Sequence, residues 1–124
     1  MSKYCHTNVQ DKGLEWLETF VERQVMTSGS PASYAEVAGM TLAAIAIDET
    51  DLTIAPGDVS GRKVTIAAQL AVDVTGTGTG DHICLVDDTD DFLMFVTQMT
   101  TPKSVESGDK VDMPAWDIEL RDPL

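Results

Sequence analysis

The sequence predicts a mainly β protein, an antiparallel β-sandwich or small barrel with one N-terminal α-helix. Apolar residues recur at helical spacing only near the N-terminus, over residues 9–25. After Pro31 the chain changes to short runs of strand-forming residues separated by turn signals. The 124 residues, of which 43% are hydrophobic, suffice for one domain that folds without a metal or disulfide.

Residues 9–25 are predicted to form the helix, because their apolar side chains share one face and most glutamates lie on the other. Gly29 and Pro31 end it, since neither residue continues a helix cheaply. We therefore expect an N-terminal helical arm, residues 1–30, and a β-sandwich domain, residues 31–124, within one compact domain. The side chains expected in the core or at an interface are Leu14, Leu17, Phe20, Val21 and Trp116.

Four segments after the helix have the patterns of β-strands. Residues 41–47 form an apolar run, and residues 63–74 alternate between apolar and polar side chains, as one long half-buried strand does. Residues 82–86 and 92–99 are apolar at both parities, which indicates strands covered on both faces. The Gly-Thr repeat at 75–80 predicts a turn or a strand end.

The parity of the apolar residues changes beside Pro114. Apolar side chains occupy odd positions from Val111 to Ala115 and even positions from Trp116 onward. One extra residue in a strand moves every later side chain to the other face, so this change predicts a β-bulge that turns Trp116 inward.

The charge balance excludes two classes of partner. Eight Lys and Arg against 21 Asp and Glu give a net charge of −13. Nucleic acids and anionic membranes both require cationic surfaces, so we expect neither as a partner. The longest apolar run, residues 40–47, is too short to span a bilayer, and the first residues lack the apolar segment of a secretory signal. We expect synthesis in a cytoplasm.

An acidic segment at residues 87–91 is the strongest candidate for a metal site. Four carboxylates in five residues offer the oxygen ligands that Ca²⁺ requires, but their spacing does not match an EF-hand loop. The alternative is a solvated hairpin tip, where Asp is favoured because its side chain accepts hydrogen bonds from nearby backbone N–H groups. We favour the hairpin tip and predict no metal; the weak candidate ligands are Asp87, Asp88, Asp90 and Asp91.

The remaining reactive side chains do not form a recognisable catalytic set. Structural zinc sites use close pairs with two to four residues between the ligands, whereas Cys5 and His6 are adjacent and only one residue separates His82 from Cys84. Neither histidine accompanies a nucleophile in a catalytic pattern, so we predict no enzyme activity and no cofactor. Cys5 is either an idle exposed thiol or the partner in an intermolecular disulfide.

Three segments carry a family resemblance. Residues 57–66 read GDVSGRKVTI, residues 74–87 read VTGTGTGDHICLVD, and residues 107–123 read SGDKVDMPAWDIELRDP. In this order they resemble a family of small structural proteins encoded by tailed bacteriophages. The resemblance covers most of the chain and consists of strand and turn sequences, so it transfers no catalytic residue.

The resemblance implies a structural component of a tailed-phage virion, and we expect a capsid decoration (cement) protein that acts by subunit contacts. A neck or tail structural protein of the phage is the alternative, and a small acidic metal- or ligand-binding module is a further one. The expected partners are its own copies, in a trimer or ring, and the major capsid or other virion proteins. Such a protein is made in the bacterial host cytoplasm and located in the virion, with its helix docked on a partner or on its own sheet.

Overall fold

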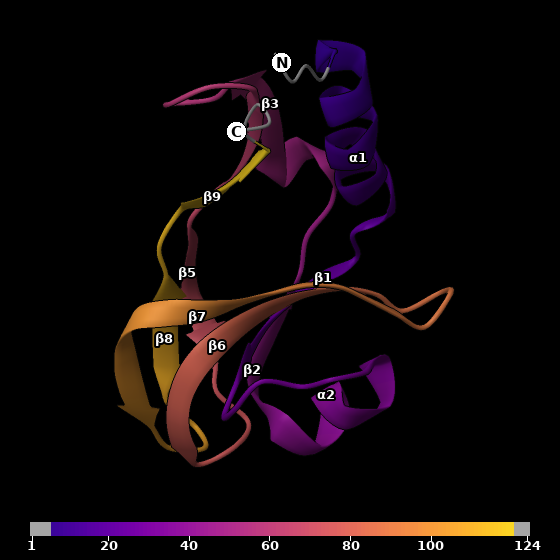
Figure 1. The fold of residues 1–124 in the computed structure, drawn as a ribbon. Helices are drawn as coiled ribbons and strands as arrows, with labels where there is room; N and C mark the ends of the chain where they lie inside the picture. The colour runs from indigo at the N-terminus through magenta and orange to yellow at the C-terminus, as the bar shows by residue number, and fades with distance from the viewer. Residues whose placement is uncertain (1–5, 121–124) are drawn as a thin grey trace.

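The fold of this protein is mainly β, with antiparallel sheets in a sandwich-like arrangement and a helix near the N-terminus, as predicted. The computed structural model describes residues 6–120 (Figure 1). In chain order, its elements are α1 (Thr7–Phe20), β1 (Arg23–Thr27), α2 (Tyr34–Met40), β2 (Thr41–Ala46), the 3₁₀ turn η1 (Glu49–Asp51), β3 (Leu52–Pro56), β4 (Arg62–Ile66), β5 (Gln69–Asp73), β6 (Gly78–Asp87), β7 (Phe92–Val105), β8 (Lys110–Met113) and β9 (Trp116–Leu120).

The described strands form three sheets. The largest has the order β2-β1-β6-β7, and the others have the orders β3-β4-β9 and β5-β8. In Figure 1 the helix α1 and the sheet that contains β3 and β9 occupy the upper part of the molecule, and the four-stranded sheet and α2 occupy the lower part. A single bridge between Ala43 and Val74 connects β2 with the segment that follows β5. Neither helix in residues 6–120 has the length and hydropathy that a membrane span requires.

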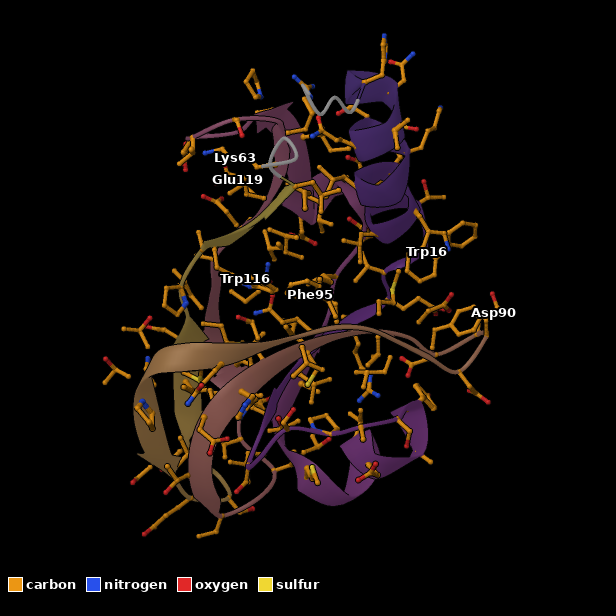
Figure 2. All side chains as sticks on the ribbon, in the orientation of Figure 1. Trp16, Lys63, Asp90, Phe95, Trp116 and Glu119 are labelled. Carbon is orange, nitrogen blue, oxygen red and sulfur yellow. The ribbon has the colours of Figure 1, made fainter. Side chains whose placement is uncertain are left out.

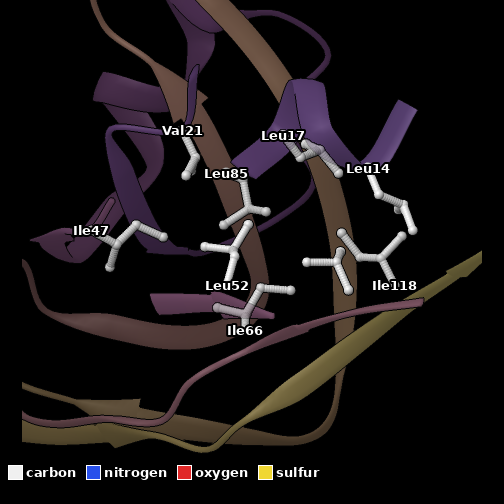
Figure 3. Close-up of a cluster of buried hydrophobic side chains, with 9 residues drawn as sticks. Leu14, Leu17, Val21, Ile47, Leu52, Ile66, Leu85 and Ile118 are labelled. Atoms are coloured by element: carbon white, nitrogen blue, oxygen red, sulfur yellow. The ribbon is translucent and has the colours of Figure 1, made fainter. Parts of the chain in front are cut away.

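The helix α1 packs its apolar stripe against the core of its own chain. Leu14, Leu17 and Val21 are buried there, as predicted. They meet residues from β3, β4, β6 and β9, so α1 joins the two parts of the fold (Figure 3). The side chains that complete this cluster are Ile47, Leu52, Val64, Ile66, Leu85 and Ile118.

The predicted helix over residues 9–25 is wrong at its C-terminal end. The helix ends at Phe20, and the residues after it turn into β1, which pairs with β2 on one side and β6 on the other. Val25 and Met26 are fully buried in this strand, so pairing with two neighbours outweighs the helical periodicity of the sequence. The expected arm, residues 1–30, therefore includes an inner strand of the largest sheet.

The predicted single strand at residues 63–74 is also wrong. It consists of β4 and β5, which belong to different sheets, with Ala67 and Ala68 between them. Ala71 has φ +52°, and the register with β8 shifts between Gln69 and Val72. This irregularity leaves Leu70 69% exposed, although its parity predicted burial.

The predicted bulge at Pro114 is a change of sheet instead. β8 pairs with β5, whereas β9 pairs with β4, and residues 114–115 carry the chain from one sheet to the other. The parity change is real, because Val111 and Met113 are buried before it and Ile118 after it. Trp116, at the start of β9, is only partly buried.

The long hairpin β6–β7 confirms the predicted strands at residues 82–86 and 92–99, but the prediction that both are covered on both faces is wrong for residues 92–99, which are half-buried or exposed. Residues 83–87 are buried at both parities, and residues 88–91 form the turn. The turn sits at the outer end of the hairpin, close to the base of α1 (Figure 1). This placement brings the acidic segment of the sequence beside the N-terminal helix.

Candidate interaction surface

Asp88 in the acidic turn is already neutralised within the chain. The guanidinium of Arg23 donates from Nε to Oδ2 and from Nη2 to Oδ1, both at 3.0 Å. The Tyr34 hydroxyl donates to Oδ1 at 2.7 Å, and the Asp88 carboxylate that accepts this bond raises the pKa of Tyr34. The turn is thus fixed to β1 and α2, and Asp88 has little remaining capacity for a cation.

Asp87 holds the turn together from inside. It is 2% exposed, and its Oδ1 accepts hydrogen bonds from the backbone N–H of Thr89 at 3.0 Å and of Asp90 at 3.3 Å. A hydrogen bond with the Glu22 carboxylate, together with burial, raises the pKa of Asp87. Hydrogen bonds, the largest from Thr89, lower the pKa of Glu22. These interactions assign Asp87 a structural role.

The other two acidic residues of the turn face solvent. Asp90 and Asp91 are exposed, and no ion pair joins either of them to a cation within residues 6–120. Asp91 has φ +58°, a left-handed conformation that Asp tolerates in turns. In the described part of the chain, no three His, Cys, Asp or Glu side chains are grouped so that they could hold a metal.

Cys84 and His82, the two described members of the zinc set considered above, have other roles. Cys84 is fully buried among apolar side chains, its Sγ lies 3.8 Å from the Thr27 hydroxyl, and burial raises the pKa of its thiol. Nδ1 of His82 lies 2.8 Å from Oδ1 of Asp81. Cys5, the candidate for an intermolecular disulfide, lies outside the described residues.

Three large aromatic side chains lie at the surface beside the acidic turn. Trp16, Phe20 and Phe92 are 41%, 45% and 49% exposed. Trp16 and Phe20 are four residues apart in α1 and so share one side of the helix. The rings of Trp16 and Phe92 are 6.0 Å apart at 55°, so the three residues form one surface, called here the aromatic face. Figure 2 shows Trp16 at the base of α1 and Asp90 at the hairpin tip.

A groove between β7 and the segment that links β8 to β9 is the second surface feature. Its volume is about 380 Å³, and its walls include Ile83, Met99 and Trp116. The buried Gln24 at its base donates from Nε2 to Sδ of Met113 at 3.0 Å and accepts from Nε1 of Trp116 at 3.4 Å. Both ends of this amide are thus engaged inside the chain.

The Lys and Arg side chains of residues 6–120 likewise bind to other groups of the chain. Five of the six take part in ion pairs with acidic side chains, and the sixth, Lys103, donates from Nζ to the backbone oxygen of Asp112 at 3.0 Å. Asp90 and Asp91 of the turn take part in none of these ion pairs. The five ion pairs are Lys12–Glu15, Arg23–Asp88, Arg62–Asp11, Lys63–Asp58 and Lys110–Asp73.

No known family model, curated protein or solved structure matches this chain. The aromatic face was not predicted from the sequence, because Phe20 fits the apolar stripe of the predicted helix. The stripe that faces the core runs through positions 10, 14, 17 and 21. Trp16 and Phe20 are four residues apart and lie beside that stripe, and this spacing was the signal in the sequence that could have predicted the aromatic face.

Proposed function

We propose that this protein is a structural component of a tailed-phage virion, a capsid decoration protein that acts by contacts between subunits. The observation that carries the proposal is the aromatic face. Large aromatic side chains are enriched at protein interfaces, and here Trp16, Phe20 and Phe92 remain exposed on elements that the core holds in place. The phage-like sequence of residues 57–66, 74–87 and 107–123 supports the same proposal.

The mechanism is burial of apolar surface against other virion proteins. A specific interface removes on the order of 1,000 Å² or more from water, and the aromatic side chains supply its centre. The net charge of −13 keeps the separate subunits apart in solution until they meet a cationic neighbour. In this proposal the protein is not an enzyme and needs no cofactor, and it resides in the virion after synthesis in the bacterial host cytoplasm.

The alternative of a metal- or ligand-binding module finds less support. Arg23 neutralises Asp88, and Asp87 is buried with its Oδ1 engaged by two backbone N–H groups. Only two of the four candidate carboxylates in the turn thus remain available to a cation, and their four oxygens are fewer than the six to eight that Ca²⁺ takes.

The test is the number of copies in purified virions, measured by gel densitometry against the major capsid protein. A decoration protein on a symmetric shell is expected in hundreds of copies, whereas a neck or tail ring holds about a dozen. A count of about a dozen copies would identify the protein as a neck or tail structural protein instead. Its absence from virions would overturn the proposal.

A further inference from the structure

We infer that the aromatic face and the neighbouring Asp90 and Asp91 dock on an apolar surface rimmed by Lys or Arg on a different protein. This inference rests on the proposed function and deepens it, because it names the surface used and the chemistry of the partner. The alternative partner of this surface is a second copy of the same chain, and the experiments below distinguish the two.

The arrangement has the layout of an interface, with an apolar centre and a polar rim. Trp16 and Phe92 are in ring contact, Phe20 lies one turn along α1, and Asp91 directly precedes Phe92 in the chain. Aromatic anchors supply most of the binding energy of such surfaces, while rim charges set the choice of partner and the rate of association. The rim here is anionic, so the complementary rim is cationic.

Rigidity also favours docking at this place. Asp87 accepts two backbone hydrogen bonds across the turn, and Asp88 is held by Arg23 and Tyr34. The backbone of the turn that carries Asp90 and Asp91 is therefore held in place, which reduces the entropy lost when a partner binds.

A second copy fits this surface poorly. Each of the six Lys and Arg residues in the range 6–120 is engaged within its own chain, five of them with carboxylates. A Lys or Arg of this range that met the acidic rim of another copy would have to share its N–H donors with the bond that it already makes. The net charge of −13 on each copy adds repulsion at low ionic strength.

The first experiment uses the purified full chain and a defined probe, an amphipathic helical peptide of leucine and lysine. A peptide of leucine and glutamate is its charge control, and calorimetry measures the affinity. The variant Trp16→Ser/Phe92→Ser keeps the net charge and is expected to bind the lysine peptide about tenfold more weakly or worse. Asp90→Asn/Asp91→Asn is expected to weaken binding mainly at low salt, because exposed charges are screened at high salt.

The matched control is Val59→Ser/Leu70→Ser, which removes two apolar side chains that are more exposed than Trp16 and Phe92 but lie outside the aromatic face. Its affinity for the lysine peptide should equal that of the wild type. If the aromatic and control variants bind equally well, net charge alone attracts the peptide and the inference is wrong. Thermal unfolding of each variant shows whether it is folded, and Phe20→Ser replaces the double variant if that one is not.

Sedimentation of the same proteins tests the second copy as occupant. We expect the wild type and Trp16→Ser/Phe92→Ser to have the same oligomeric state, because the aromatic face does not serve self-association. A dimer or trimer that this variant dissociates would overturn the inference, since the face would then be a contact between copies.

The virion experiment separates this inference from the proposed function. Trp16→Ser/Phe92→Ser is expected to reduce the copies per virion at least tenfold, and Val59→Ser/Leu70→Ser is expected to leave them unchanged. Full occupancy by the aromatic variant would refute the docking surface while the virion role stands. If the wild type is absent from virions, the proposed function fails, while the peptide and sedimentation results still decide the chemistry of the surface.

Discussion

The side chains of Glu22 and Asp87 accept a hydrogen bond from the same backbone group, the N–H of Thr89. The distances from this nitrogen are 2.9 Å to Oε1 of Glu22 and 3.0 Å to Oδ1 of Asp87. A hydrogen bond with the Glu22 carboxylate favours the protonated form of Asp87 and, together with burial, raises the pKa of Asp87. The pair links the segment before β1 to the turn between β6 and β7.

We expect Asp87→Asn to change how stability depends on pH. A carboxyl group with a raised pKa in the folded state contributes its full stabilisation below its ordinary pKa of 3.8, and loses it as the pH rises through the raised value. An asparagine retains Oδ1 as an acceptor and stays neutral, so it undergoes no such loss. The melting temperature of Asp87→Asn relative to wild type should therefore increase as the pH rises from the ordinary pKa of 3.8 through the raised pKa of Asp87.

Asp90→Asn is the matched control for this pH experiment. Asp90 is exposed in the same turn, so its replacement should leave the pH profile of the melting temperature close to that of wild type. Parallel profiles for Asp87→Asn and wild type would mean that Glu22 and Asp87 do not compete for a proton.

We expect Cys84 to be unreactive in the folded protein. Its thiol is fully buried, and burial raises its pKa, so the fraction of reactive thiolate is small. In a Cys5→Ser variant, an aromatic disulfide reagent at mildly alkaline pH should detect almost no thiol before unfolding and one thiol per chain after it. Rapid reaction in the native protein would show that the sheet opens around Cys84.

The fold class and the core face of the helix could be predicted from the sequence, because both depend on local periodicity. Leu14, Leu17 and Val21 lie in the core as their spacing predicts. The change of parity beside Pro114 also corresponds to a real feature of the chain, its passage from one sheet to another. Periodicity reports which way side chains point but not which strand they pair with, so a change of sheet was interpreted as a bulge.

The end of the helix and the surface at its base could not be predicted in the same way. Val25 fits the helical stripe, and its place in β1 is decided by pairing with Ala44 and Cys84, which are distant in sequence. The contact between Trp16 and Phe92 likewise depends on how the hairpin β6–β7 lies against α1. Long-range pairing of this kind is not encoded in any short window of sequence.

We expect Trp116 to contribute to stability through its ring and its N–H group together. Its ring packs 5.9 Å from that of Phe95, and Nε1 donates to the buried Gln24. Because Trp116 is only partly buried, Trp116→Ala should lower the free energy of unfolding by about 2–3 kcal/mol, less than a fully buried tryptophan would. Trp116→Phe keeps the ring contact and leaves Gln24 without this donor, at a cost of about 1 kcal/mol.

Asp117→Ala is the control next to Trp116 in β9. Asp117 accepts a hydrogen bond from the Thr65 hydroxyl at 2.6 Å and lies 3.6 Å from Nζ of Lys63, but these contacts are exposed. Exposed pairs contribute at most about 1 kcal/mol, so Asp117→Ala should cost clearly less than Trp116→Ala. Equal losses in denaturant unfolding would contradict the placement of Trp116 against Phe95.

The last prediction concerns Gly61, which precedes β4. It has φ +70°, and a Cβ atom there would lie 1.9 Å from the backbone oxygen of Leu120 in β9. The backbone of β9 would have to move, and a side chain in this left-handed region adds strain. Gly61→Ala should therefore lower the free energy of unfolding by more than about 2 kcal/mol.

Gly39→Ala provides the matched comparison for Gly61→Ala. Gly39 lies in α2, and a Cβ atom there would meet no atom within 4 Å. Alanine is favoured over glycine in a helix by about 0.5–1 kcal/mol, so this variant should be as stable as wild type or more stable. Urea unfolding measures both variants, and opposite signs of the stability change are expected. If Gly61→Ala were as stable as wild type, the end of β9 would not lie against the turn before β4, and the three-stranded sheet would need a different register.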